Sequence, residues 1–303
     1  MATFFEMLSI QLVLIVYVLA GVLAYRKRMI TDQNRPALIK LIVEILVPAL
    51  IFKSFFNITW NIIELSFQTL IIATIIYTTI TLFGGFFFRD LPEKQAKILH
   101  YATLCNSAGF AGLPIVTSLF GELGAILAAV YLIPHRIFTY TIGISLLVKQ
   151  EKSFKETLLS FIKNPMILAV IFGLVLGLSQ ISIPSFIMNS FDGLSRTVTP
   201  LSMITIGSII GSVKMEALFE KAVIRFVGVR MLLIPLIVLL SLKFLQVDEQ
   251  IAGMCVVMAT MPAGATTPIL AAKYDLDVAL ASKLTFVSII LSLFLSPAFL
   301  AFV

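Results

Sequence analysis

Ten apolar runs, each about twenty residues long, fill most of the chain and leave it few possible folds. A helix needs about 20 consecutive apolar residues to cross the hydrocarbon core of a bilayer. Inside lipid the backbone groups have to pair within the segment, so such runs form helices. The expected membrane segments are 5–25, 37–56, 66–88, 97–119, 123–148, 165–181, 190–211, 218–243, 250–272 and 278–302.

Composition agrees with this pattern. Hydrophobic residues make up 59% of the 303 residues and charged residues only 13%, whereas about a quarter of the residues in a soluble domain are charged. We therefore expect an all-α, multi-pass integral membrane protein surrounded by membrane lipid. The basic residues cluster in short loops, so the positive net charge does not indicate nucleic acid. The two cysteines lie in apolar segments without metal-ligand spacing, so we expect no metal and no cofactor.

The loop charges orient the predicted segments. Loops one, three, five, seven and nine hold sixteen lysines and arginines, whereas the intervening loops hold only Lys53, Arg196 and Lys243. Basic loops stay on the cytoplasmic side of a membrane. Both termini should therefore face outward, and the regular alternation supports a count of ten segments.

Glycine and proline recur at matching places in two halves of the chain. The matched positions are Gly21, Pro48 and Pro114 in the first half and Gly173, Pro200 and Pro268 in the second. The first spacing is 27 residues in both halves, and the second is 66 residues in one and 68 in the other. We therefore expect two five-helix repeats, residues 1–152 and 153–303. Because five is odd, the second repeat is inverted, an arrangement typical of secondary transporters.

The fourth and ninth apolar segments are interrupted by glycine and proline, at residues 106–114 and 261–268. Proline cannot donate a backbone hydrogen bond and glycine lets two backbones approach closely, so we expect the two broken helices to cross. Broken helices persist at membrane depth only where they are buried in protein or line a wet cavity. The candidate substrate-binding residues in these stretches are Asn106, Gly109, Gly112, Pro114, Thr266, Thr267 and Pro268.

The chemistry of this crossing favours an anion as cargo. Helix N-termini present free N–H groups and a positive dipole end. Neither stretch contains aspartate or glutamate, whereas a cation site needs negatively charged oxygens. The alternative is a sodium- or proton-coupled cation antiporter. Asn106 also has two possible roles, because its amide can either bind a carboxylate or pair with backbone groups freed by the break.

Ionisable residues elsewhere in the apolar segments are further candidates, because such groups are costly in a membrane. Glu44, one turn before Pro48, is either a proton-coupling group or an ion-pair partner of Lys40. His135 and Arg136 interrupt the fifth segment directly after Pro134.

His135 titrates near neutral pH, so it is a candidate for both coupling and substrate binding. Arg136 could hold a carboxylate through two hydrogen bonds, and Tyr131 lies one turn before His135 on the same face. The alternative for His135 and Arg136 is an internal polar bridge or a pair at the membrane interface.

Several of these motifs resemble one known family. The pattern Asn106, Phe110, Gly112 and Pro114 resembles the fourth helix of the auxin efflux carrier family, especially its bacterial branch. The run from Met261 through Pro268, followed by Ala272-Lys273-Tyr274, resembles that family's ninth helix. Val47-Pro48 in the second segment also fits, so Val47 and the nearby Ile51 join the candidate substrate-binding residues. The resemblance covers the whole chain.

The resemblance implies an elevator-type permease in the cytoplasmic (inner) membrane of a bacterium. Helices 1, 2, 6 and 7 would form a scaffold domain, and helices 3–5 and 8–10 a transport domain. The implied fold is similar to that of bile acid symporters and sodium/proton antiporters. Family cargoes are organic anions, such as auxin and malonate, and plant members are homodimers.

We therefore expect a secondary carrier of a small organic anion, either a carboxylate or an auxin-like weak acid. H⁺ is the candidate coupling ion, and a homodimer is the expected assembly. The sequence contains no enzyme motif, such as a nucleotide-binding glycine loop or a His-Glu-x-x-His pattern, so an enzyme is not expected.

Overall fold

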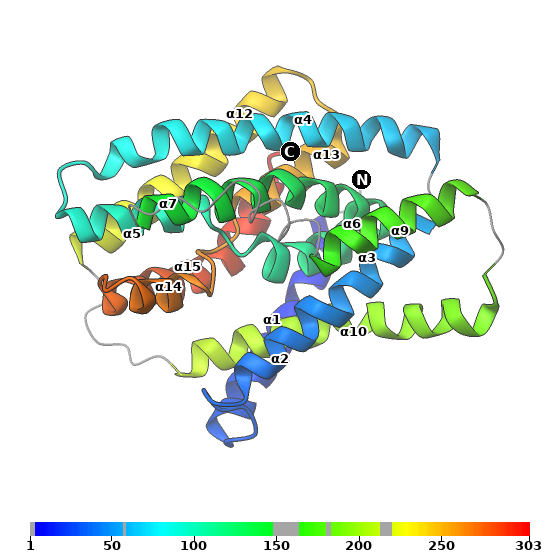
Figure 1. Cartoon of the computed structure of the whole chain (residues 1–303), viewed down its shortest axis with the longest axis horizontal. Coiled ribbons are helices and arrows are strands. Elements are labelled where there is room, and N and C mark those ends of the chain that lie inside the picture. The colour runs from blue at the N-terminus through cyan, green and yellow to red at the C-terminus, as the bar shows by residue number, and fades with distance from the viewer. Residues whose placement is uncertain (1–3, 57–58, 148–163, 180–182, 213–219) are drawn as a thin grey trace. The chain divides into compact units, whose positions relative to one another are not determined.

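The computed structural model describes residues 4–56, 59–147, 164–179, 183–212 and 220–303 (Figure 1). Over these ranges the chain is helical and contains no strand, which confirms the predicted all-α class. Short π or 3₁₀ turns interrupt several helices, so one predicted segment often contains two helical pieces. No sequence pattern predicted these turns.

Helices overlap every predicted membrane segment. In chain order the helices and turns are α1 (Phe4–Arg26), α2 (Arg35–Leu41), η1 (Ile42–Leu46), α3 (Val47–Phe56), α4 (Trp60–Phe83), η2 (Gly84–Phe88), α5 (Glu93–Leu104), η3 (Ala108–Gly112), α6 (Leu113–Phe138), η4 (Thr139–Gly143), α7 (Ile144–Leu147), α9 (Pro165–Ser179), α10 (Ser185–Ser212), α11 (Lys221–Phe226), η5 (Val227–Leu233), α12 (Ile234–Phe244), α13 (Glu249–Ala259), α14 (Thr267–Lys273) and α15 (Val278–Leu300).

Several helical stretches are long and apolar enough to cross a membrane, which supports the integral membrane class. By length and composition the described residues contain four of them: Trp60–Phe88, Ala108–Leu147, Lys221–Phe244 and Val278–Leu300. The second stretch is 40 residues long, and it turns at Gly121, where φ is +64°. A positive φ favours glycine because glycine lacks a Cβ. The count of ten crossings stays a prediction.

The chain divides into two compact units, each assembled from three stretches. Unit 1 consists of Met1–Thr69, Gly109–Val130 and Ser160–Val213, and unit 2 consists of Leu70–Ala108, Tyr131–Leu159 and Lys214–Val303. Each unit therefore draws on both halves of the chain.

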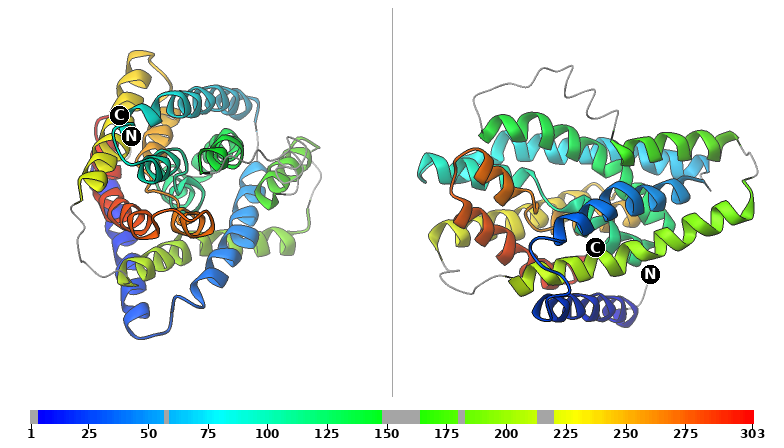
Figure 2. Two further views of the ribbon diagram at one scale, coloured as in Figure 1. Left: turned by 60° about the vertical axis from the view of Figure 1, so that its left-hand side comes forward. Right: turned by 60° about the horizontal axis from the view of Figure 1, so that its bottom comes forward.

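Unit 1 is built around the packing of α1 on α10 and of α3 on α9 (Figure 2). Two glycines allow α1 and α10 to touch through their backbones. A Cβ added at Gly21 would lie 2.0 Å from the carbonyl oxygen of Ile204, and one added at Gly207 would lie 1.9 Å from that of Val18. Membrane helices commonly associate through such small residues, because lipid supplies no hydrophobic drive between them.

Unit 1 also contains a charged cluster that ties three helices together. The Lys53 ammonium on α3 lies 3.1 Å from a carboxylate oxygen of Glu122 on α6 and 2.5 Å from one of Asp192 on α10. Arg196, one turn further along α10, also binds Asp192 at 2.7 Å.

Unit 2 has an apolar core formed mainly by α5, α11 and α15. Its fully buried members include Phe88, Leu99, Phe226, Ala281 and Leu284. Two helices of this core also form ion pairs: Arg225 of α11 with Asp90, and Lys283 of α15 with Glu220. This core also includes residues of α14, so it contains one helix from beside each break: α5 and α14.

Candidate functional site

The two predicted breaks are present, and they meet inside unit 2. Helix α5 ends at Leu104. Helix α13 ends at Ala259, and seven residues separate it from the start of α14. The freed backbone groups pair with each other: Ser107 N–H donates to the Pro262 carbonyl, and Gly264 N–H donates to the Cys105 carbonyl, both at 2.8 Å. Asn106 and Ala263 thereby form a short antiparallel bridge. We call residues 105–107 and 262–264 the crossing.

Close approach at the crossing depends on Gly264. A Cβ at this position would lie 3.1 Å from both the carbonyl oxygen and the Sγ of Cys105, a separation tighter than most Cβ contacts. The prolines at 262 and 268 supply no N–H, which prevents a regular helix from continuing through this stretch. The crossing is therefore encoded locally by the residues that break the helix.

The Asn106 amide is committed to the backbone at the crossing. Its Nδ2 donates to the Met258 carbonyl at 2.9 Å, and its Oδ1 accepts from the Ala108 N–H at 3.3 Å. The Tyr77 hydroxyl also donates to this Oδ1, at 3.4 Å. Of the two roles expected for Asn106, the structure shows the pairing with backbone groups freed by the break. Contact with a cargo stays a prediction.

Aromatic side chains surround the buried Asn106. The Tyr77 ring centroid lies 5.5 Å from that of Tyr131 and 5.2 Å from that of His135. His135 is only 7% exposed, and neither of its ring nitrogens has a hydrogen-bond partner. The Asn106 backbone lies near this ring, but it is not aligned for a hydrogen bond to it. Tyr131 and His135 therefore both lie beside Tyr77, whose hydroxyl contacts Asn106.

The predicted threonines differ in their surroundings. Thr266 is exposed, and its Oγ1 lies 3.8 Å from the Cys105 Sγ. Thr267 is buried, and its hydroxyl has no hydrogen-bond partner. Pro268 is half-buried in the first turn of α14, and Arg136 is half-buried on α6. All four belong to unit 2.

The remaining predicted site residues belong to unit 1. These are Glu44, Val47, Ile51, Gly109, Gly112 and Pro114. Val47 and Ile51 are fully buried. The Pro114 carbonyl accepts hydrogen bonds from Ser118 at 2.9 Å and from Thr199 of α10 at 3.3 Å. Within unit 1 the Thr199 hydroxyl therefore links α10 to the first turn of α6.

The surroundings of Glu44 match its expected role as an ion-pair partner of Lys40. Its side chain is 51% exposed, and its carboxylate lies 3.9 Å from the Lys40 ammonium one turn earlier. At that distance and exposure the pair contributes little to stability.

One charged residue at the crossing was missed by the sequence reasoning. Arg230 lies on η5 and is 1% exposed. Its guanidinium donates to the carbonyl of Ala259 and, at 3.1 Å, to that of Met261. These carbonyls stand at the end of α13. An arginine in the middle of an apolar run was the available signal, since such residues are functional candidates by default.

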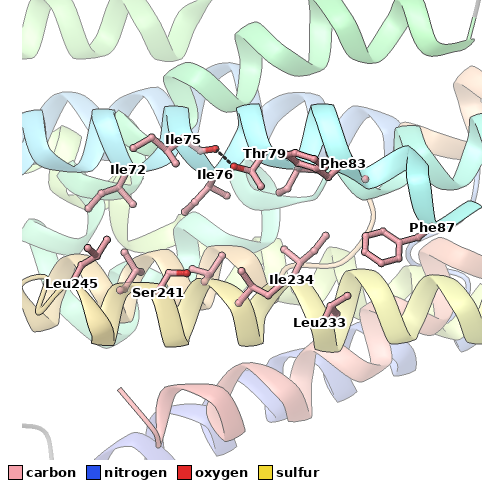
Figure 3. Close-up of a pocket in the computed structure, with 15 residues that line it drawn as sticks. Ile72, Ile75, Ile76, Thr79, Phe83, Phe87, Leu233, Ile234, Ser241 and Leu245 are labelled. Carbon is pink, nitrogen blue, oxygen red and sulfur yellow. Dashed lines mark hydrogen bonds between the residues drawn. The ribbon is translucent and has the colours of Figure 1, made fainter.

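An apolar groove between α4 and α12 is a different kind of feature (Figure 3). Its volume is about 470 Å³, and aliphatic and aromatic side chains form most of its lining, among them Ile72, Ile76, Phe83, Ile234 and Leu245. The Thr79 hydroxyl in this groove already donates to the Ile75 carbonyl at 2.8 Å. With no charged side chain in its lining, the groove is poorly suited to a small anion.

Comparison with known proteins gives a consistent result over the whole chain. The profile of a family described as membrane transport protein matches residues 7–157 and 152–300. An uncharacterized transporter of Methanothermobacter thermautotrophicus is 25% identical over 289 residues, which cover 93% of this chain and 94% of the relative. An uncharacterized transporter of Methanocaldococcus jannaschii is 24% identical over 94% of this chain and 95% of the relative. An uncharacterized transporter of Escherichia coli is 22% identical over 91% of this chain and 90% of the relative.

Proposed function

Because this chain belongs to the membrane transport protein family, we propose that it is a secondary carrier of a small organic anion that works by alternating access. The membership confirms the resemblance to auxin efflux carriers. It also identifies the chain as a transporter rather than an enzyme, in agreement with the descriptions of its relatives.

The observation that carries the proposal is the meeting of two unwound stretches in unit 2. Their backbone groups pair across the crossing, and polar side chains surround them. In secondary transporters, matched broken helices form the substrate site near the middle of the membrane. The crossing is therefore the proposed binding site, with Asn106, His135 and Thr267 as its candidate polar contacts.

An organic anion suits the chemistry of this site better than a cation. Neither interrupted stretch contains a carboxylate, and the buried groups without partners include the hydroxyl of Thr267 and the ring of His135. A hydroxyl and a neutral imidazole each have one hydrogen to donate, and a carboxylate accepts such hydrogens. The cation antiporter is the competing function.

The division of the chain supports an elevator-type movement. Unit 1 contains most of the helices expected in the scaffold, and unit 2 contains most of those expected in the transport domain. The stretch Gly109–Val130 groups with unit 1, although it was expected in the transport domain. We propose that the two units are the bodies that move during transport.

Charged contacts support the proposed topology of ten crossings with both termini outside. Every ion pair between distant stretches of the described chain joins loops expected on the same side. On the outer side Lys53 pairs with Glu122 and Asp192; on the inner side the pairs are Lys94 with Asp275, Arg225 with Asp90 and Lys283 with Glu220. An extra or missing crossing would place the partners of some pairs on opposite sides.

Transport by purified protein in liposomes tests the function. Uptake and efflux are measured for a panel of mono- and dicarboxylates, with and without an imposed potential or pH gradient. We expect at least one carboxylate to move, and the potential to bias a net anion by about 2.3 kcal/mol per charge per 100 mV. Movement of sodium or protons without any carboxylate would establish the antiporter instead.

A further inference from the structure

Arg230 is a charge in an unusual place. It lies near the middle of the apolar stretch Lys221–Phe244 and is 1% exposed. Among the residues whose exposure the structure describes, it is the only lysine, arginine, aspartate or glutamate that is buried. Removing a charge from water without an opposite charge is strongly unfavourable, so a role in function is the first expectation for such a residue.

The contacts of Arg230 hold it at the break of the ninth segment. Its two terminal nitrogens donate to the carbonyls of Ala259 and Met261, which have lost their helical partners because α13 ends there. The Asn106 amide satisfies the adjacent Met258 carbonyl. A helix C-terminus carries about half a negative charge, so the end of α13 attracts the guanidinium and keeps it at the crossing.

These contacts leave part of the charge uncompensated. The partial charge of a helix end is smaller than the full charge of a guanidinium. No carboxylate within the described ranges forms an ion pair with Arg230, and its Nε has no hydrogen-bond partner. The site therefore has an excess of positive charge and of hydrogen-bond donors.

We infer that Arg230 is the fixed positive charge that makes the crossing selective for an anion. This inference rests on the proposed function and identifies the residue that decides the sign of the cargo. Because charges interact more strongly in a low-dielectric interior than in water, Arg230 can act on a carboxylate at the crossing without touching it. A neutral cargo of the same shape would gain little from this charge.

A purely structural role predicts a different result. If Arg230 only held the end of α13, its hydrogen bonds would matter and its charge would not. Arg230→Lys keeps the charge but lacks the planar fork that reaches two carbonyls. Arg230→Gln keeps one donor group and loses the charge. The two variants therefore separate charge from geometry.

The test compares these variants in liposome transport of a carboxylate and of its neutral amide analogue. We expect Arg230→Lys to keep the KM for the carboxylate within about threefold of the wild type, with a lower kcat. Arg230→Gln should raise that KM at least tenfold and reduce the preference for carboxylate over amide. Arg225→Gln is the matched control. Arg225 lies near the start of the same stretch, where it is hydrogen-bonded to Asp90, and its substitution should leave KM unchanged.

Two outcomes would overturn the inference while leaving the proposed function in place: an unchanged KM in Arg230→Gln, or an increase of tenfold or more in Arg230→Lys. If the Gln variant does not fold, the Lys variant decides alone. A wild-type protein that moves sodium or protons and no carboxylate would overturn both the inference and the proposed function.

Discussion

At the scale of single residues, Asn106 is expected to stabilise the fold through the crossing. Asn106→Ala would remove the hydrogen bonds of the amide to the Met258 carbonyl and to the Ala108 N–H, at a cost of about 1–3 kcal/mol. We expect a lower Tm for this variant in detergent. Asn61→Ala, at an exposed position of α4, is the control and should melt like the wild type. Equal melting of the Asn106 variant would show that its amide contributes nothing to the backbone.

The same variant separates the two roles of Asn106. If the amide also contacts the cargo, a transported carboxylate should stabilise the wild type and fail to stabilise Asn106→Ala. The comparison uses the rise in Tm on adding carboxylate, so the lower starting Tm of the variant does not affect the result.

A pH-dependent contribution is expected from Asp90, in the turn before α5. The hydrogen bond from Arg225 holds the pKa of the Asp90 carboxyl below its usual range. Because the folded pKa is lowered, the contribution to stability is present above the unfolded pKa and is lost as the pH falls through the folded pKa. Asp90→Asn should lower Tm slightly at neutral pH, and the difference should disappear in acid. Glu64→Gln, at an exposed carboxylate, is the control and should melt like the wild type at neutral pH.

Single residues also mark the limit of what the sequence could predict. Asn106 was identified because an amide within a glycine- and proline-rich interruption is conspicuous. Arg230 was missed because its own segment is otherwise regular and apolar, and its acceptors lie 29 and 31 residues further along the chain. No local pattern links an arginine to the carbonyls of a helix that ends so far away.

At the scale of helices, the close packing of α1 on α10 gives a matched pair of glycine variants. Gly207→Ala would place a Cβ 1.9 Å from the Val18 carbonyl oxygen, and overpacking of this kind typically costs about 1–3 kcal/mol. Gly193→Ala, on the same helix, meets nothing within 4 Å and should be neutral or slightly stabilising. Thermal melting in detergent checks both; a Gly207 variant as stable as the Gly193 variant would contradict this packing.

Helices were predicted well where composition alone decides them. Apolar runs predicted nearly all of the helical pieces, and the breaks were predicted because proline and glycine act locally. The sequence did not indicate which helices pack against each other. Gly21 and Gly207 lie 186 residues apart, and only the folded chain shows that their backbones touch.

At the scale of the whole molecule, impermeant cysteine labelling on intact cells tests the proposed topology. The native Cys105 and Cys255 are buried, so the background reaction should be low. Gln250 lies on the side expected to face outward, and Lys27 lies on the side expected to be cytoplasmic; both positions are exposed, and each is replaced by cysteine in turn. We expect only the cysteine at 250 to react with the impermeant reagent, and both to react once the membrane is permeabilised. The reverse pattern would invert the orientation. Equal reaction at both positions in intact cells would remove the alternation on which the count of ten crossings and the inverted repeat depend.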